Sequence, residues 1–117
     1  MGYMDELAQG IYEHNRKQGF YDRETLTFRD PVLGDVEGRV VNPSFASEKL
    51  MLIVSECSEV LDALRNGDSE NEAEEIADIL IRTLDYAAWR GIRLDIEVER
   101  KMERNRARPV LHGRKVF

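Results

Sequence analysis

Two pairs of acidic residues, placed in two consecutive helical segments, constrain this chain more than any other feature. Glu56 and Glu59 lie three residues apart, as do Glu75 and Asp78, and residues three apart share one face of a helix. If the two helices pack antiparallel, the four carboxylates meet between them and repel one another strongly unless a cation joins them. Mg²⁺ prefers carboxylate and water oxygens, commonly beside substrate phosphates. The pattern therefore predicts a magnesium site between two helices.

The same pairs also fit a less specific interpretation. Charged helices carry such spacings by chance, and the four carboxylates would then lie on a solvated face with ordinary contacts along each helix. Two further observations favour the metal site. The break between the two helices is short, which makes them antiparallel neighbours, and a basic segment that could neutralise phosphate follows them. From Glu99 to Phe117 the chain carries seven lysines and arginines against two glutamates, although its net charge is −6.

Hydrophobic periodicity predicts four helices, at about residues 4–18, 48–65, 69–90 and 95–105. We expect Ser47, Ser69 and Asp95 to cap the last three of them. In the second helix, apolar residues recur at steps of three and four and predict a stripe that faces the core: Leu50, Val54, Cys57, Leu61 and Leu64. The third helix has a similar stripe: Ile76, Leu80, Thr83 and Ala87. On this basis we expect Cys57 to be a small buried residue.

The segment at about 23–46 is different, because short runs of β-forming residues flank residues that favour turns. We expect either a loop or a small β-hairpin arm there. The predicted fold class is therefore all-α, an up-down helical bundle that carries this arm, in a single domain over residues 1–117. The fourth helix has too few apolar residues to be buried on both sides, so one chain would leave hydrophobic stripes uncovered. We therefore expect a homodimer or a homotetramer.

The overall composition excludes several classes of protein. Apolar residues make up 42% and charged residues 34% of the chain, which fits a soluble globular protein and not a disordered one. The negative net charge argues against a nucleic-acid partner, because affinity for phosphate backbones comes from lysine and arginine. No apolar run is long enough to span a bilayer, and no secretory signal is visible. The single cysteine fits a reducing compartment, so we expect a cytoplasmic location and no membrane partner.

Two motifs in the chain resemble those of the MazG-like all-α nucleoside triphosphate pyrophosphohydrolases. The first is Ser55-Glu56-x-Ser58-Glu59 followed by Glu74-Glu75-Ile76-Ala77-Asp78. The second is Lys101-Met102-x-x-Asn105-Arg106-x-Arg108-Pro109 with His112-Gly113-x-Lys115. The resemblance covers about residues 45–115 and gives residues 23–44 no counterpart. It implies an enzyme that splits a nucleoside triphosphate into the monophosphate and pyrophosphate, by attack of water at the α-phosphorus.

The resemblance also implies a cofactor and a set of site residues. Mg²⁺, with Mn²⁺ as a substitute, would be bound by four residues that are also catalytic: Glu56, Glu59, Glu75 and Asp78. Lys101 would meet a phosphate and Asn105 a phosphate or the sugar, although Lys101 also fits a solvated surface lysine. The base would bind near the first helix, with His14, Gln18, Phe20 and Tyr21 as candidates by location.

Two arginines are expected to bind substrate on more local grounds. Arg82 lies one turn beyond Asp78 and points near the metal site, where it would orient Asp78, reach the substrate or form a structural salt bridge. Arg108 would clamp a phosphate in bidentate fashion, or pair with Glu103 or with another subunit.

Two other functions remain open from the sequence. A phosphoribosyl-ATP pyrophosphohydrolase shares the acidic helical pattern, but the arm at 23–46 and the extended tail rank it second. A non-catalytic helical oligomerisation module, in which the acidic seam binds a cation structurally, is the alternative outside the enzymes. Hydrolysis of nucleoside triphosphates in the presence of Mg²⁺ separates the three.

Overall fold

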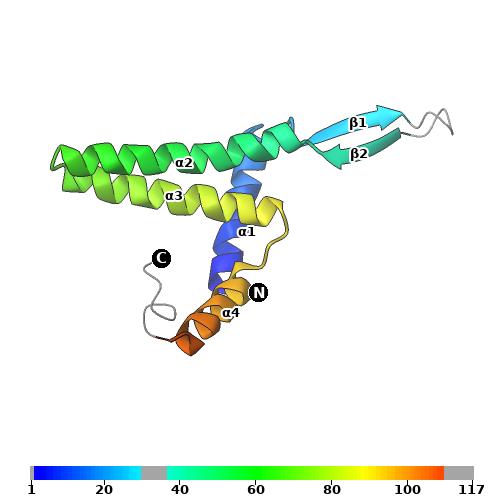
Figure 1. Cartoon of the computed structure of the whole chain (residues 1–117). Helices are drawn as coiled ribbons and strands as arrows, with labels where there is room; N and C mark the ends of the chain where they lie inside the picture. The colour runs from blue at the N-terminus through cyan, green and yellow to red at the C-terminus, as the bar shows by residue number, and fades with distance from the viewer. Residues whose placement is uncertain (1, 30–36, 110–117) are drawn as a thin grey trace.

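The computed structural model of the protein describes residues 2–29 and 37–109. These ranges contain four helices and two strands: α1 (Tyr3–Lys17), β1 (Thr25–Arg29), β2 (Glu37–Val41), α2 (Pro43–Arg65), α3 (Ser69–Trp89) and α4 (Leu94–Ala107). The predicted all-α architecture is confirmed, and the arm expected at about 23–46 contains a pair of antiparallel strands (Figure 1). Thr25 pairs with Val41 at the helical end of this pair, and Arg29 pairs with Glu37 at the other. None of the helices in the described ranges is long and apolar enough to cross a membrane.

α2 and α3 form a long antiparallel hairpin, which is the main axis of the molecule (Figure 1). The chain reverses at Gly67, whose positive φ of 67° is a conformation that favours glycine. The Gly67 and Asp68 amides donate hydrogen bonds to the last carbonyls of α2, at 3.2 and 2.9 Å. α1 packs across α3, and α4 packs on α1 near its N-terminal end, away from the hairpin. Among the helices of residues 2–29 and 37–109, only α2 and α3 run side by side along their lengths.

Two helices are capped by residues other than those predicted. Asn42, and not Ser47, caps α2, because its Oδ1 accepts hydrogen bonds from two backbone amides of the first turn at 3.1 and 3.4 Å. Pro43 follows at the first helical position, which suits proline because the missing N–H would have no partner there. Asp68, and not Ser69, caps α3 through a 3.1 Å hydrogen bond to an amide of the first turn. In both cases the capping residue is an asparagine or aspartate that lies upstream of the predicted serine.

Asp95 does not cap α4 as predicted, since it lies inside the first turn of that helix and joins α4 to α1. The Asp5 amide donates to Asp95 Oδ2 at 2.9 Å, and the Asp95 amide donates to Asp5 Oδ1 at 3.3 Å. Arg93 also forms an ion pair with Asp5, in which Nε lies 3.6 Å from Oδ2. Each aspartate thus satisfies an amide in the first turn of the other helix.

Aromatic rings gather where the end of α1, the start of α2 and the end of α3 meet. Tyr21 lies at the centre of the cluster, with its ring centroid 4.9 Å from that of Tyr12 and 5.7 Å from those of Phe45 and Trp89. Most of these rings meet edge to face, an arrangement that aromatic pairs favour. The indole N–H of Trp89 donates to Glu24 Oε2 at 3.0 Å, so its polar atom is also satisfied. This cluster fixes the start of α2 against α1 and α3.

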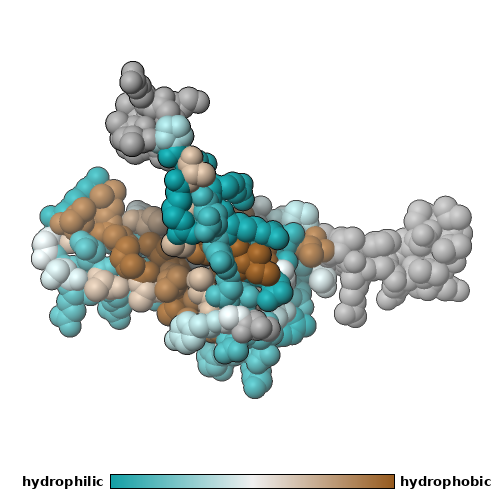
Figure 2. Space-filling model, turned by 90° about the horizontal axis from the view of Figure 1, so that it is seen from below, coloured by the Kyte–Doolittle hydropathy of each residue, from teal (hydrophilic) through white to brown (hydrophobic). Residues whose placement is uncertain are grey.

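The stripe predicted to face the core from α2 lies on the surface of the chain instead. Its leucines and valine, together with Ile76 and Leu80 of α3, are between 45 and 61% exposed: Leu50, Val54, Leu61 and Leu64. Cys57 is exposed as well, so the prediction that it is buried is wrong. Figure 2 shows the resulting apolar surface along the hairpin. The reason is that α1 crosses the hairpin near one end, and α4 packs on α1 and buries none of its own residues.

Candidate metal centre and adjoining cavity

Three carboxylates meet between α2 and α3, where the acidic motifs predict them. One oxygen from each of Glu56, Glu75 and Asp78 lies within 4.8 Å of the other two. Glu56 projects from the face of α2 that packs on α3 and is only 8% exposed, whereas Glu75 and Asp78 are half-buried. Glu59 is exposed and lies outside this group of three, but it is close enough to contribute to the raised pKa of Glu75. The structure therefore brings three of the four predicted ligands together, with the fourth beside them.

Arg82 neutralises part of this acidic cluster. Its Nε donates a hydrogen bond to Glu56 Oε1 at 2.9 Å, so of the roles considered for Arg82 the structure contains the salt bridge. The other oxygens, Glu56 Oε2 and Glu75 Oε2, are buried and have no hydrogen-bond partner among the described residues. Buried acceptors without a partner are uncommon in native proteins. Two such oxygens in one group of carboxylates are acceptors that a cation could satisfy.

Crowding of the carboxylates shifts two pKa values in opposite directions. Hydrogen bonding with Glu56, and then with Glu59, raises the pKa of Glu75 to about 8. Hydrogen bonding with Glu75, and further with Arg82, lowers the pKa of Glu56. Near neutral pH, Glu75 therefore keeps its proton, while Glu56 beside it is ionised. A cation bound at this point would take the place of that proton.

The donor atoms of the cluster fit a hard divalent cation. All three side chains offer carboxylate oxygens, and no histidine or cysteine within the described ranges joins them. Mg²⁺ and Mn²⁺ prefer such oxygen ligands, and Mg²⁺ commonly completes its shell with water and substrate phosphates. Glu56, Glu75 and Asp78 would hold the ion, and Glu59 lies beside this group.

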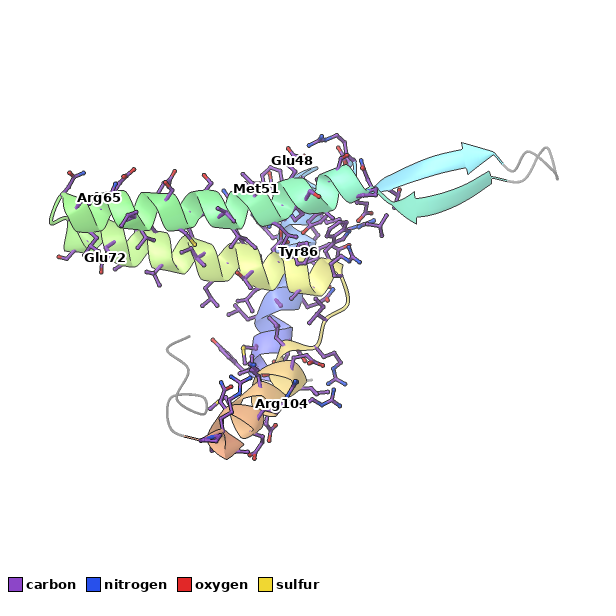
Figure 3. The ribbon with its side chains drawn as sticks, in the orientation of Figure 1. Glu48, Met51, Arg65, Glu72, Tyr86 and Arg104 are labelled. Carbon is purple, nitrogen blue, oxygen red and sulfur yellow. The ribbon has the colours of Figure 1, made fainter. Side chains whose placement is uncertain are left out.

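A cavity of about 600 Å³ adjoins the cluster and extends towards the end of α1. Its volume lies within the range of roughly 300–1,000 Å³ that is common for small-molecule sites. Thirteen residues line it: Asn15, Gly19, Phe20, Asp22, Arg23, Phe45, Glu48, Lys49, Leu52, Asp78, Ile81, Arg82 and Asp85. Glu48 is labelled in Figure 3 and lies near the crossing with α1, whereas Arg65 and Glu72 mark the free end of the hairpin. Asp78 and Arg82 belong to both the cluster and the cavity wall.

A buried ion pair lines the cavity at the end away from the acidic cluster. Lys49 Nζ lies 2.9 Å from Asp85 Oδ2, and their side chains are 13 and 5% exposed. The Tyr21 hydroxyl donates to the same oxygen at 2.7 Å. The Lys49 ammonium also lies 4.2 Å from the centre of the Tyr21 ring. Burial and the Asp85 carboxylate raise the pKa of Tyr21 above its ordinary value, which keeps its hydroxyl a donor.

Sequence reasoning missed Lys49 and Asp85, although a signal for both was present. Lys49 lies seven residues before Glu56, and Asp85 lies seven residues after Asp78. A step of seven is close to two helical turns, so each charge shares a helix face with a metal-site residue. Opposite charges at matching positions on two antiparallel helices predict an ion pair across the seam.

The other predicted substrate-binding residues lie elsewhere in the chain. Lys101 and Asn105 are exposed on α4 and do not line the cavity, and Arg108 follows the end of that helix. Among the candidates for base binding, Phe20 lines the cavity and Tyr21 is buried beneath it. His14 and Gln18 are exposed and lie outside the cavity wall. The motif residues His112, Gly113 and Lys115 lie outside the described residues.

Comparison with known proteins adds the family. Residues 45–110 match the family described as MazG nucleotide pyrophosphohydrolase domain, which is more than half of the chain. The chain therefore belongs to this family, and the resemblance drawn from its motifs is confirmed. No curated protein and no solved structure matches it. The matched region contains all of α2 except its first two residues, and also α3, the acidic cluster and α4.

Binding of a divalent cation is expected to release close to one proton per site at pH 7, because it displaces the proton held by Glu75. At pH 9, above the raised pKa, the release should be near zero. Isothermal titration calorimetry with Mg²⁺ or Mn²⁺, in two buffers of different ionisation enthalpy, measures the number of protons. Glu75→Gln is the control, and an equal release at both pH values would contradict a proton held by Glu75.

Proposed function

We propose that the protein is a Mg²⁺-dependent nucleoside triphosphate pyrophosphohydrolase, which yields a nucleoside monophosphate and pyrophosphate. The observation that carries the proposal is the group of three carboxylates, with two unpaired buried oxygens, beside a cavity of nucleotide size. Membership of the family supports the class of reaction. The preferred ion, the four-residue ligand set with Glu59 and the substrate are parts of the proposal.

The residues of the site have separate proposed roles in this reaction. Glu56, Glu59, Glu75 and Asp78 would hold the ion, which supplies a positive charge for the phosphate oxygens and lowers the pKa of a bound water. Arg82 holds one oxygen of Glu56 and so orients the other towards the cluster. In the proposed step the water gives up a proton to a carboxylate of the cluster or to solvent, and its oxygen forms the new bond at the α-phosphorus. The bond to the bridging oxygen breaks, and pyrophosphate leaves with that electron pair. The substrate would approach through the cavity, whose wall includes Asp78 and Arg82.

The basic residues of α4 are proposed to act on a site built with a second copy of the chain. Within one chain, α4 packs on α1, and its Lys101 and Asn105 do not line the cavity. Arg108 continues this basic segment, which fits contact with phosphates. An assembly that brings α4 of one chain towards the cavity of another would let Lys101, Asn105 and Arg108 bind the substrate.

We propose a homodimer, or a tetramer of two dimers, in which the exposed stripe of the hairpin is covered by a second copy. Large exposed apolar surfaces on soluble proteins mark interaction sites, and a two-fold axis covers the same surface on both chains.

The single cysteine is also consistent with our further proposal of a cytoplasmic location.

Leu61→Glu is expected to convert the assembly to monomers, because it places a charge in the middle of the apolar stripe. Sedimentation velocity on the wild type should give at least twice the 13.5 kDa of one chain, and the variant should give a single chain mass. Ile92→Glu, at an exposed apolar residue outside the stripe, is the matched control. A wild type that sediments as a monomer would contradict the dimer.

The reaction is tested with a panel of nucleoside and deoxynucleoside triphosphates, and with phosphoribosyl-ATP, in the presence of Mg²⁺. We expect pyrophosphate release from nucleoside triphosphates, and ¹⁸O from labelled water in the monophosphate product. Label in the pyrophosphate would show attack at the β-phosphorus and overturn the proposed step. Turnover of phosphoribosyl-ATP alone would assign that activity instead, and turnover of none would leave a structural module.

A further inference from the structure

We propose that the Lys49 ammonium donates a hydrogen bond to a carbonyl oxygen of the nucleotide base. The cavity would then prefer a base with an oxo group to its counterpart with an amino group. This inference rests on the proposed function, because it assumes that a nucleotide occupies the cavity. It assigns a specificity role to a residue outside both sequence motifs.

The Lys49 ammonium is fixed on one side and faces the cavity on the other. Asp85 is its one ion-pair partner within the described ranges, at 2.9 Å. The rings of Tyr21 and Phe45 lie 4.2 and 5.5 Å from Nζ, and Tyr21 holds Asp85 in place through its hydroxyl. An ammonium group has three N–H donors, and rings and a single carboxylate do not use all of them. Since Lys49 lines the cavity, the remaining donors are available to a ligand.

The position of Lys49 favours the base over the phosphates as its ligand. Its partner Asp85 lies two turns along α3 from the metal-site residue Asp78, which corresponds to about 10 Å. An α-phosphate bound at the acidic cluster keeps the β- and γ-phosphates within a few bonds of the metal. The base lies across the ribose, and the cavity extends in one piece from Asp78 to Lys49. With the α-phosphate at one end, the base reaches the other.

The chemistry of the ammonium then sets the preference. Lysine only donates hydrogen bonds, so it pairs with an oxo group and is left facing another donor when the base carries an amino group. A hydrogen bond that involves a charged group is among the stronger ones in proteins. Its loss in a water-poor site is expected to cost roughly tenfold in affinity or more.

Two matched pairs of ligands test this preference: the α,β-methylene analogues of dITP and dATP, and those of dUTP and dCTP. Within each pair the exocyclic group of the base changes from oxo to amino. Dissociation constants are measured by calorimetry with Mg²⁺ for the wild type, for the double variant Lys49→Met/Asp85→Asn and for Arg65→Met. The double variant removes both charges and keeps an acceptor for the Tyr21 hydroxyl. Arg65 belongs to an exposed ion pair at the free end of the hairpin.

We expect the wild type and Arg65→Met to bind the oxo member of at least one pair roughly tenfold more tightly. In the double variant this ratio should fall close to one. A ratio that the double variant leaves unchanged would overturn the inference, as would tighter binding of the amino member in both pairs. A purely structural role of Lys49 would weaken both members equally and is excluded by the ratio.

A measurement on the wild type covers the case in which the double variant does not fold. The chain has four lysines, so protein labelled with ¹³C at lysine Cε gives four signals that substitutions at the other three assign. The Lys49 signal should shift more with the oxo than with the amino ligand, and equal shifts would overturn the inference. Failure of the proposed function is separate: oxo-selective binding without pyrophosphate release overturns only the reaction, and no binding overturns both.

Discussion

Replacement of Glu75 by glutamine is expected to lower pyrophosphate release by roughly 100-fold or more, because it removes an ionised ligand from the acidic cluster. The metal-free variant should nevertheless remain folded. The pKa of Glu75 is raised to about 8 in the folded chain, so the residue is protonated near neutral pH, and glutamine resembles that neutral form. Steady-state kinetics with saturating Mg²⁺ measures the loss, with Glu72→Gln on the same helix as the control.

The same substitution is expected to change how stability depends on pH. Glu75 has an ordinary pKa of 4.5 and a folded value of about 8, so between these values the unfolded chain releases a proton that the folded chain keeps. The stabilising contribution is therefore complete below pH 4.5 and is lost as the pH rises through 8. Thermal unfolding of the metal-free wild type from pH 5 to 8.5 should show this decline, and Glu75→Gln should flatten it. A variant that unfolds at neutral pH would show that the residue is structural.

Replacement of Asp85 by alanine is expected to lower the free energy of unfolding by about 3–5 kcal/mol, the largest effect on stability that the structure indicates. The substitution leaves the Lys49 ammonium without its partner in a site where only 13% of the side chain is exposed. It also removes the acceptor of the buried Tyr21 hydroxyl. Urea unfolding followed by circular dichroism at two wavelengths gives the value.

The double variant Lys49→Met/Asp85→Asn should recover most of this loss, because no charge then remains buried and the methionine packs on the same rings. Glu48→Ala is the matched control, since its ion pair with Arg23 is exposed and worth less than about 1 kcal/mol. A loss below about 1 kcal/mol for Asp85→Ala would mean that water reaches Lys49 freely.

The parts of the fold that depend on local spacing could be predicted from the sequence. Residues three apart share a helix face whatever surrounds them, so Glu56, Glu75 and Asp78 could be placed in one seam. The short break at Gly67 made the two helices antiparallel. The strand pair between 23 and 46 followed from β-forming runs, although the sequence alone left a loop equally open.

Features that depend on contacts between distant segments could not be predicted in the same way. Periodicity marks an apolar stripe but does not say what covers it. The α2 stripe with Leu61 was expected to face the core, and the sequence did not show which of the stripes one chain would leave uncovered. The caps of α2 and α3 were misplaced because serine was preferred where Asn42 and Asp68 lie further upstream. The ion pair of Lys49 and Asp85 was missed because its signal appears only when the spacings on both helices are compared, and not from the spacing within either one.

The paired aspartates at the two helix starts have a mechanical consequence. Asp5 and Asp95 clamp α4 to one end of α1, while the opposite end of α1 carries Asn15 and leads into Phe20, both in the cavity wall. α1 is about 22 Å long, so it separates the cavity at one of its ends from α4 at the other. A tilt of α1 at the cavity would therefore also displace Lys101 and Asn105 on α4, which couples the two ends of the helix.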